Sequence, residues 1–489
     1  MKLAALGEAA GVPIDGAGDT RVTGFAIDHR KVAPGTVFGA FEGAKVNGED
    51  FIPQAVASGA VGIVARREAQ VSGAAHIASD EPRRTFAHLA AKFFTPVPDT
   101  IVAVTGTNGK TSTVEMTRQI WRMCGERAAS IGTLGVTTPD ESVSTGLTTP
   151  DIVTFLSNLS GLAREGVTHV AYEASSHGLS QFRNEGVRVS AAAFTNFSRD
   201  HLDYHGTMDA YFEAKMRLFD DVLSPGATAI VWCDGSDWSA KAVERASARG
   251  LTVHTVGPKG DTLTLTAREP TQLGQTITVL HDGADRTVRL PLIGAYQAAN
   301  ALTAAALALA TGADTGQVFD ALSRLQPVRG RLERAVITKS GAPVYVDYAH
   351  TPDALAAAID ALKPHVDGRL IAVFGAGGDR DHGKRAGMGE TVANAADVVI
   401  VTDDNPRGED PATIRAAVME GAPGASEIGD RREAIAAAIA QADAADIVLI
   451  AGKGHEQGQI VGAGDQERVL PFDDVTVARE CAASQGVHG

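Results

Sequence analysis

The segment Thr105–Ser112, with the sequence Thr-Gly-Thr-Asn-Gly-Lys-Thr-Ser, constrains the fold of this chain more than any other. An apolar, β-branched run precedes it and a helical pattern follows it. Small residues between a strand and a helix let backbone N–H groups close around phosphate oxygens, while Lys110 adds a positive charge and the Thr111 hydroxyl can bind Mg²⁺. A simple glycine turn would not need the strand, the Lys-Thr pair and the helix together. The segment predicts a P-loop, with phosphate contacts from Gly106, Thr107, Asn108, Gly109, Lys110, Thr111 and Ser112.

The length of 489 residues predicts roughly three domains, since a typical domain has about 150 residues. Two prolines interrupt a helical run at Phe94–Asp99, and Gln326–Gly330 is a second plausible boundary. Apolar strands alternate with helical stretches after the first boundary, which is typical of βαβ units. We therefore expect a small α/β domain at 1–98, a central P-loop domain with a mostly parallel sheet at 99–328, and a Rossmann-like α/β domain at 329–489.

Two stretches of the central segment depart from this alternation. Short alternating runs around Thr252–Leu290 predict an antiparallel insertion. The Ala-rich stretch Ala298–Ala310 is long for a strand and too short to span a membrane, so it predicts a buried helix.

Three strands of the last segment share one feature. Leu370–Phe374, Val398–Thr402 and Ile447–Ile450 each run into a polar or glycine-rich loop. In open α/β sheets, ligands bind beyond the carboxyl ends of the strands. We expect the three loops to converge on one ligand site.

Charge and composition exclude several classes of function. The chain has 44 basic and 59 acidic residues and a formal charge of −15, which opposes binding to nucleic acids and to anionic membrane surfaces. Its 3 cysteines have neither disulfide-framework nor zinc-site spacing. No apolar run approaches the length of a membrane-spanning helix. We expect a cytoplasmic protein that acts on small molecules.

Nucleotide hydrolysis also requires metal ligands near the phosphates. Glu173 ends an apolar strand pattern, and His205 lies in a loop rich in histidine and aspartate. A single histidine of this kind is more often structural or solvated. Lys215 lies in a helical pattern, where the simplest interpretation is a surface lysine.

Taken together, these motifs resemble the Mur ligases, which are ATP-dependent, amide-forming enzymes of bacterial peptidoglycan synthesis. The resemblance covers nearly the whole chain. The matching segments are Gly106–Ser112, Leu147–Pro150, Tyr172–Leu179, Asp200–Gly206, Lys215, Asn300, Gly330–Glu333 and Asp347–Pro352.

Within this family the sequence is most similar to the members that add meso-2,6-diaminopimelate to the D-glutamate of UDP-N-acetylmuramoyl-L-alanyl-D-glutamate. Those members have an Asp-Asn-Pro-Arg motif, present here at Asp404–Arg407. The alternative interpretation of this motif is an ordinary turn, since Asn-Pro often forms turns. A guanidinium suits the carboxylate that distinguishes diaminopimelate from lysine. The resemblance implies that diaminopimelate contacts Arg380, Asp404, Asn405, Pro406, Arg407, Gly452 and Glu456.

The resemblance also implies the other ligand contacts. The UDP-N-acetylmuramoyl-dipeptide would meet Ile27, His29, Ala44, Lys45, Val46, Thr148, Thr149, Ser175, Gln181 and Arg183. Many relatives have serine at the position of His29. In addition to the P-loop, ATP would meet Asn300, Arg331, Asp347 and His350. Two Mg²⁺ ions are expected on Thr111, Glu173, His205 and a carbamylated Lys215, and the catalytic residues would be Lys110, Lys215, His205 and Glu173.

The implied reaction is amide formation through an acyl phosphate, with release of ADP and phosphate, by a monomeric enzyme. Two alternatives remain. Folylpolyglutamate synthetase shares the ATPase architecture, but it has no comparable uridine-nucleotide domain and no reason to carry Asp-Asn-Pro-Arg. A regulatory P-loop ATPase would bind a protein partner instead of a small substrate, although no Asn-Lys-x-Asp motif accompanies the loop.

Overall fold

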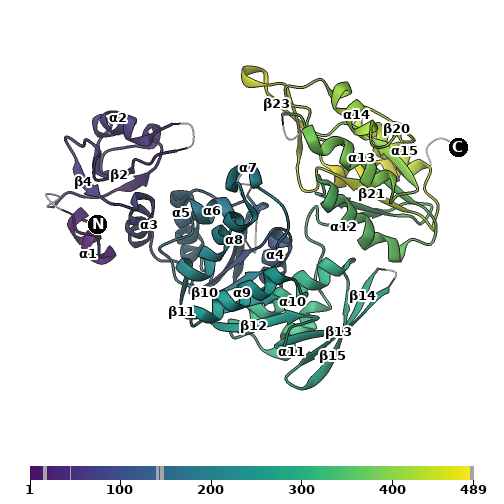
Figure 1. Ribbon diagram of the computed structural model, residues 1–489, viewed down its shortest axis with the longest axis horizontal. Coiled ribbons are helices and arrows are strands. Elements are labelled where there is room, and N and C mark those ends of the chain that lie inside the picture. The colour runs from purple at the N-terminus through teal and green to yellow at the C-terminus, as the bar shows by residue number, and fades with distance from the viewer. Residues whose placement is uncertain are drawn as a thin grey trace. The chain divides into compact units, whose positions relative to one another are not determined.

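The computed structural model describes residues 1–14, 19–43, 46–138, 142–143, 148–271, 273–379 and 382–484. These residues divide into two compact units. Figure 1 labels their helices and strands. The first unit comprises Met1–Leu265, Leu280–Ala284 and Ala299–Ala321, and the second comprises Thr266–Val279, Asp285–Ala298 and Leu322–Gly489.

The first unit begins with a parallel sheet in the order β1-β2-β3-β4, covered by helices. Phe86 of helix α3 packs edge-on against Phe25 and Phe41, with ring centroids 5.3 and 5.4 Å apart. This part is therefore a small α/β layer structure, as expected. Its elements are α1 (Leu3–Ala10), β1 (Gly24–Ala26), η1 (His29–Lys31), β2 (Thr36–Gly39), η2 (Gly48–Phe51), α2 (Ile52–Ala57), β3 (Ala60–Ala65), β4 (Ala75–Ala78) and α3 (Pro82–Phe93).

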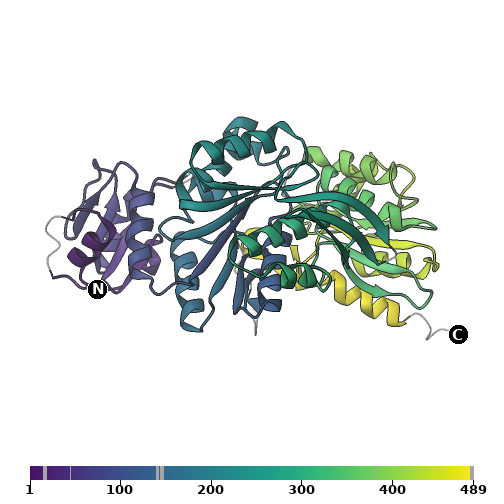
Figure 2. The same cartoon turned by 90° about the horizontal axis from the view of Figure 1, so that it is seen from below.

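The largest sheet has the order β15-β14-β13-β12-β11-β10-β5-β9-β6-β7-β8. The strands from β12 to β6 pair in parallel, and helices lie on both faces of this sheet (Figure 2). Burial on both faces explains the continuous apolar sequences of β5, β6, β9 and β10. The elements are β5 (Thr100–Thr105), α4 (Lys110–Met123), β6 (Ala128–Gly132), β7 (Gly135–Thr137), β8 (Ser142–Val143), α5 (Ile152–Arg164), β9 (His169–Glu173), α6 (Ser176–Ser180), β10 (Val189–Phe194), α7 (Leu202–His205), α8 (Met208–Arg217), π-helix η3 (Leu218–Val222), β11 (Leu223–Trp232), α9 (Asp237–Ala248), β12 (Thr252–Gly257), β13 (Leu263–Thr271), β14 (Gly274–His281), β15 (Ala284–Leu290), α10 (Ala295–Ala310) and α11 (Thr315–Leu322).

The order of these strands fixes the position of the P-loop. β5 lies between β9 and β10, and all three are parallel. The segments that follow the three strands therefore emerge at the same edge of the sheet. These segments hold the P-loop, the residues after Glu173, and Thr195-Asn196.

The expected antiparallel insertion begins later than the sequence pattern suggested. β12 pairs in parallel with β11, so it belongs to the parallel part of the sheet. β14 and β15 are joined by Asp282 and Gly283, which have φ values of 50° and 75°. Positive φ at both positions is the signature of a tight hairpin turn. Because the start of β13 also pairs in parallel with β12, the antiparallel insertion is limited to the pairings among β13, β14 and β15.

The second unit contains a sheet in the order β16-β17-β21-β18-β19-β20, in which only the β16–β17 pair is antiparallel. β21, β18 and β19 are neighbours, so the three polar loops do emerge at one edge, as expected. The elements are β16 (Glu333–Ile337), β17 (Pro343–Asp347), α12 (Pro352–Leu362), η4 (Lys363–His365), β18 (Leu370–Phe374), η5 (His382–Lys384), α13 (Arg385–Ala393), β19 (Val398–Val401), α14 (Pro411–Met419), β20 (Ser426–Glu427), α15 (Arg431–Ala440), β21 (Ile447–Ala451), β22 (Gly458–Val461), η6 (Gly464–Gln466), β23 (Arg468–Pro471) and α16 (Asp474–Ser484).

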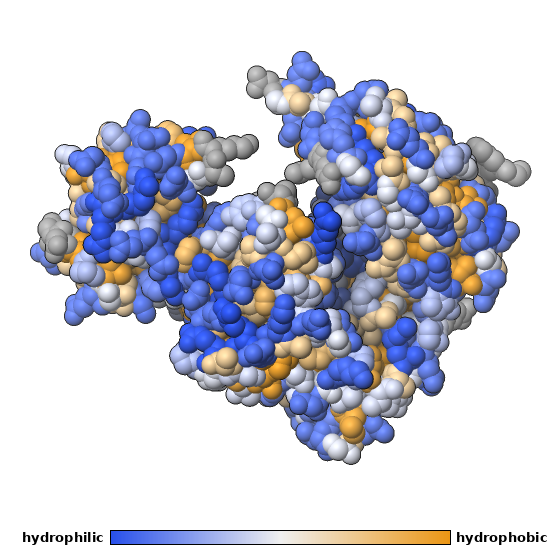
Figure 3. Space-filling view, viewed as in Figure 1, coloured by the Kyte–Doolittle hydropathy of each residue, from blue (hydrophilic) through white to orange (hydrophobic). Residues whose placement is uncertain are grey.

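The surface agrees with the charge of the chain. Hydrophilic residues cover most of the face in Figure 3, and hydrophobic residues occur among them in small groups. Within the described ranges, no helix combines the length and apolar character needed to cross a membrane. The Ala-rich helix α10 is mostly buried, as predicted.

Candidate active site

The P-loop connects the end of β5 to the first turn of α4. Its two glycines have positive φ, 141° at Gly106 and 85° at Gly109, which other residues rarely adopt. A Cβ at Gly109 would collide with the side-chain oxygen of Asn300, and Thr113 Oγ1 donates to that oxygen at 3.5 Å. The structure thus brings Asn300, expected to meet ATP, next to the P-loop.

The segment after β10 holds the outer part of the P-loop. The Asn108 carbonyl accepts from Thr195 Oγ1 at 2.6 Å and from Asn196 Nδ2 at 3.0 Å. The Asn108 N–H donates to Asn196 Oδ1 at 2.9 Å. Two side chains from the segment that follows β10 therefore fix the loop conformation before any nucleotide binds.

Two lysines meet at one carbonyl of the P-loop. Lys110 Nζ donates to Gly106 O at 3.0 Å and to Thr107 O at 2.7 Å, while Lys215 Nζ donates to Gly106 O at 2.6 Å. Lys215 is 1% exposed, so the interpretation as a surface lysine is wrong. Burial lowers the pKa of Lys215 well below its usual value, and the charge of Lys110 lowers it further.

Glu173 lies at the end of β9 and is 2% exposed. Its Oε1 accepts from the Thr133 N–H at 2.7 Å, and its Oε2 accepts from Thr133 Oγ1 at 3.3 Å. A Cβ at Gly132 would collide with this carboxylate, which explains the glycine there. Glu173 is therefore a buried, oriented oxygen donor at the carboxyl edge of the sheet.

His205 lies at the end of α7 among other rings. Its ring centroid is 4.8 Å from that of Tyr204, 5.2 Å from that of Tyr211 and 5.5 Å from that of His177. Tyr211 connects this group to the P-loop, because its hydroxyl donates to Thr107 Oγ1 at 3.3 Å and Lys215 Nζ lies 4.4 Å from its ring centre. Across the parts of the chain that are described, no three His, Cys, Asp or Glu side chains form a group that could hold a metal ion.

Four of the residues expected to bind the muramoyl-dipeptide form one cluster. Thr149 Oγ1 donates to Glu173 O at 2.8 Å and accepts from the Ser175 N–H at 3.1 Å. Arg183 donates through Nη1 to Thr149 O at 2.8 Å and through Nη2 to Gln181 Oε1 at 2.7 Å. Thr148 lies close by, because its hydroxyl is 3.0 Å from that of Thr133.

The residues expected to bind the uridine end lie near the four-stranded sheet. Ile27 and Val46 are exposed, whereas His29 stacks on Phe51 with 4.3 Å between the ring centroids. A serine could not make this ring contact. Ala44 and Lys45 lie outside the described residues.

In the second unit, the Asp404–Arg407 loop and the Gly452–Glu456 loop lie side by side. Asn405 Nδ2 donates to Glu456 Oε2 at 2.8 Å, and a Cβ at Gly452 would collide with the Asp404 carboxylate. Arg407 has a φ of 51°, and its Nη1 donates to Gly378 O at 2.9 Å. Arg380, the remaining residue of the expected pocket, lies outside the described residues.

The buried Arg431 side chain lies beneath both loops. It forms a 2.7 Å ion pair with Asp474 in which both side chains are 0% exposed. It also donates to Ala451 O at 3.0 Å and to Asp403 O at 3.3 Å. One guanidinium therefore connects the ends of β19 and β21.

The second unit also brings together Arg331, Asp347 and His350, which were expected to meet ATP. The Arg331 guanidinium lies 4.7 Å from the ring centre of Tyr348, and His350 Nδ1 is 2.8 Å from Tyr348 O. Asp347 accepts from the Leu332 and Ala349 N–H groups at 2.7 and 2.8 Å. Burial raises the pKa of Asp347, while the charge of Arg331 opposes the rise.

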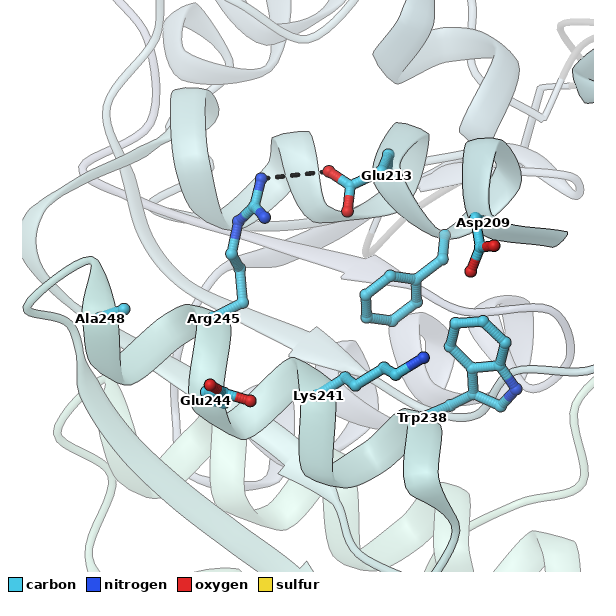
Figure 4. Close-up of a pocket in the computed structure, with 8 residues that line it drawn as sticks. Asp209, Glu213, Trp238, Lys241, Glu244, Arg245 and Ala248 are labelled. Atoms are coloured by element: carbon cyan, nitrogen blue, oxygen red, sulfur yellow. Dashed lines mark hydrogen bonds and ion pairs between the residues drawn. The ribbon is translucent and has the colours of Figure 1, made fainter. Parts of the chain in front are cut away.

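A hollow of about 360 Å³ between α8 and α9 is separate from these groups (Figure 4). Phe212 and Trp238 form its apolar part, and Arg245 donates to Glu213 at 3.1 Å across one end. None of its lining residues was expected to bind a ligand. We therefore place the candidate site at the sheet edges and not in this hollow.

Three family models match the chain. They are described as the Mur ligase family catalytic domain, which matches residues 21–93, the Mur ligase middle domain, 104–308, and the Mur ligase glutamate ligase domain, 330–454. A protein of Zymomonas mobilis named UDP-N-acetylmuramoyl-L-alanyl-D-glutamate--2,6-diaminopimelate ligase is 60% identical over 462 residues, 94% of this chain and 95% of that protein. The chain belongs to the Mur ligase family.

Further comparisons agree with this membership. A Bradyrhizobium diazoefficiens protein of the same name is 51% identical and covers 95% of each chain. A solved structure of that name has 34% identity and a TM-score of 0.74, and it covers 98% of this chain and 99% of its own. An ADP complex of Mycobacterium tuberculosis folylpolyglutamate synthase has a TM-score of 0.62, 21% identity and coverage of 76% and 91%, and it shows the fold alone.

Sequence reasoning missed several residues of this Mur ligase site. The Tyr204 hydroxyl accepts a hydrogen bond from Gln181 Nε2 at 3.2 Å. Burial lowers the pKa of Arg83, and the nearby positive charge of Arg183 lowers it further. Thr133 donates hydrogen bonds to Glu173, and Tyr211 donates one to Thr107 of the P-loop. Tyr204 lies in the matching segment Asp200–Gly206, where only His205 was expected to bind a ligand, and the other three residues lie outside the matching segments. Lys453 lies in the loop that follows β21, but its role depends on burial that the sequence does not show.

Proposed function

We propose that this Mur ligase adds meso-2,6-diaminopimelate to the D-glutamate of UDP-N-acetylmuramoyl-L-alanyl-D-glutamate, with ATP as co-substrate, in peptidoglycan precursor synthesis. The observation that carries the proposal is the contact of the Asp404–Arg407 loop with Glu456, in a chain 60% identical to a relative named for this activity. Arg407 supplies a guanidinium for the second carboxylate of diaminopimelate. Glu456 supplies a carboxylate for the distal ammonium group.

The reaction forms an amide through an acyl phosphate. The free γ-carboxylate of the D-glutamate residue attacks the γ-phosphorus of ATP, and ADP leaves. The amine of diaminopimelate then attacks the activated carbonyl carbon, and the tetrahedral intermediate expels phosphate. Lys110 and the P-loop N–H groups orient the triphosphate and stabilise its developing charge, so no side chain has to form a covalent bond.

Carbamylation of Lys215 fits the surroundings of this residue. A buried lysine with a lowered pKa is neutral at lower pH than an exposed one, and the neutral amine is the form that combines with CO₂. The product is a carboxylate in place of a cation. Together with Thr111, Glu173 and His205 it would hold Mg²⁺, which supplies charge neutralisation between the substrate carboxylate and ATP.

We further propose the division into domains at 1–98, 99–328 and 329–489, which the three separate family-model matches support. A monomeric, cytoplasmic enzyme is part of the same proposal. ATP and a nucleotide-linked substrate support the cytoplasmic location.

The test is phosphate release and product mass with purified enzyme, ATP, Mg²⁺ and UDP-N-acetylmuramoyl-L-alanyl-D-glutamate. Reactions contain meso-diaminopimelate, L-lysine or no amino acid. We expect a tripeptide product that depends on diaminopimelate. Preference for lysine would overturn the proposed specificity, and the absence of product with either amino acid would favour a regulatory ATPase.

A further inference from the structure

Lys453 carries a charged group into a fully buried position beside the two loops. Its side chain is 0% exposed. Its Nζ donates to Asn405 Oδ1 at 2.9 Å and to Glu456 Oε2 at 3.3 Å. Asn405 Nδ2 donates to the same Glu456 oxygen at 2.8 Å, so the three side chains form a closed triangle.

Burial of an ammonium group is costly unless hydrogen bonds and an opposite charge compensate for it. Here Glu456 provides the opposite charge. Asn405 completes the arrangement, because its Oδ1 also accepts from the Ile460 N–H at 2.9 Å and its orientation is therefore fixed. A methionine would fill similar space without this cost, so packing alone does not explain a lysine at this position.

The triangle fixes one oxygen of Glu456 and leaves the carboxylate accessible. Glu456 is 30% exposed, although Lys453 beneath it is fully buried. Both hydrogen bonds from the triangle go to Oε2. Among the residues that the structure describes, none donates to Oε1. The carboxylate thus has a fixed inner oxygen and an outer oxygen that can accept a hydrogen bond from a ligand.

The surrounding charges support an attachment through Lys453. Arg431 is the other buried cation of this region, but Asp474 pairs with it, and its further hydrogen bonds go to backbone carbonyls. Arg407 donates to Gly378 O. Within the described part of the chain, Lys453 is the cation that is hydrogen-bonded to Glu456.

We propose that Lys453 is a positioning residue for amino-acid recognition, which holds Glu456 oriented so that its outer oxygen accepts a hydrogen bond from the distal ammonium group of diaminopimelate. This inference rests on the proposed function. Lys453 itself does not contact the substrate. Its role is exerted through Glu456 and Asn405.

The first experiment compares Lys453→Met with Lys363→Met, an exposed lysine of the same unit that is 49% exposed and pairs with Asp360. The wild-type enzyme must first show diaminopimelate-dependent product, because its failure would concern the proposed function and not Lys453. We expect the KM for diaminopimelate to rise about 10- to 100-fold in Lys453→Met, the range of one hydrogen bond to a charged group. The KM for ATP should stay within about twofold, and Lys363→Met should resemble wild type.

Two further variants separate positioning from general loop stability. Lys453→Gln keeps an N–H donor, so it should restore part of the affinity for diaminopimelate. In a Glu456→Gln background, Lys453→Met should add little, because the group on which it acts has lost its charge. Independent effects of the two substitutions, or equal increases in the KM values for ATP and diaminopimelate, would overturn the proposal. If Lys453→Met does not fold, the Lys453→Gln variant and its combination with Glu456→Gln provide the same test.

Discussion

At the scale of single residues, Arg407 combines an unusual backbone with a fixed side chain. Its φ of 51° lies in the left-handed region, and its Nη1 donates to a backbone carbonyl. A guanidinium has five donors, so one bond to Gly378 leaves others for a carboxylate. A residue that is not glycine at such a φ is often part of a functional site.

Replacement of Arg407 by alanine should raise the KM for diaminopimelate roughly 100-fold or more, because two hydrogen bonds to a charged group are lost. The KM for ATP should change little. Steady-state phosphate release measures both values. Arg407→Lys keeps the positive charge but loses the paired N–H donors of the guanidinium, so its KM for diaminopimelate should lie between those of the wild type and Arg407→Ala. Equal weakening of ATP and diaminopimelate would contradict the assigned role.

Lys215 leads to a prediction about CO₂. Its pKa lies well below the ordinary lysine value, so the amine becomes neutral at a lower pH and remains available to CO₂ as pH rises above that pKa. Removal of CO₂ from enzyme and buffer should lower activity, and bicarbonate should restore it. Acidification should favour the protonated amine and loss of the carbamate. Lys215→Arg should show no response to bicarbonate, and full wild-type activity without CO₂ would contradict the prediction.

Residue types and spacing predict the P-loop, Glu173 and the Asp404–Arg407 loop, because each has a local pattern with a chemical reason. Lys453 and Tyr204 are different. Lys453 pairs with Glu456 three positions further on, but its hydrogen bond to Asn405 spans 48 positions, and the bond between Tyr204 and Gln181 spans 23. Such contacts depend on which loops the sheet brings together, and no local pattern contains that information.

At the scale of elements, the turn from β5 into α4 requires glycine for two reasons. Gly109 has a φ of 85°, and an added Cβ would strike Asn300. Only the second reason involves a residue expected to meet ATP. The two contributions can therefore be separated with a matched glycine elsewhere.

Gly109→Ala should weaken ATP binding more than it destabilises the fold. The control is Gly125→Ala after the end of α4, where φ is 96° but no atom lies within 4 Å of an added Cβ. Both substitutions should cost about 1 kcal/mol through backbone strain. Only Gly109→Ala should raise the KM for ATP, as measured beside thermal unfolding. Similar KM values in the two variants would show that the Asn300 contact is unimportant.

Strands buried on both faces can be predicted from sequence, because short continuous apolar runs such as those at β9 and β18 are typical of the interior of a parallel sheet. The sequence of β12 alternates between apolar and polar residues, so the pattern places β12 in the antiparallel insertion. In the structure, the first four residues of β12 are exposed or only partly buried. Pairing direction is a property of neighbouring strands. An alternating sequence at the side of a parallel sheet therefore resembles a hairpin strand.

At the scale of the whole molecule, the proposed reaction has two chemical stages with different requirements. The acyl phosphate requires ATP and the muramoyl-dipeptide. The second stage also requires the amino acid, whose expected ligands lie in the loops after β18, β19 and β21. The two stages should therefore be separable by substitution.

Hydroxylamine should intercept the acyl phosphate when diaminopimelate is omitted, giving a hydroxamate and phosphate after ADP has left. We expect Arg407→Ala to form this hydroxamate within about threefold of the wild-type rate, because the variant affects only recognition of the incoming amine. Mass spectrometry of the nucleotide-linked product measures the rate of hydroxamate formation by both enzymes. A reaction without ATP is the control. An active wild-type ligase that forms no hydroxamate would contradict a free acyl phosphate.

Length, proline-containing boundaries and the alternation of strands and helices predict three segments, whereas the structure divides into two compact units. The assignment of 266–279 and 285–298 to the second unit could not be predicted. Membership in a compact unit depends on contacts between residues far apart in the sequence. Neither stretch has a composition that sets it apart from the segment around it.

The buried guanidinium of Arg431 affects how the amino-acid specificity of the enzyme could be changed. Because it donates to the backbone carbonyls of Asp403 and Ala451, it connects the ends of β19 and β21 without any contribution from the Arg407 side chain. Position 407 can then be varied on a constant scaffold. A library of variants at that position would sample new amino-acid specificities in proteins that still fold. A new specificity would then need few additional mutations.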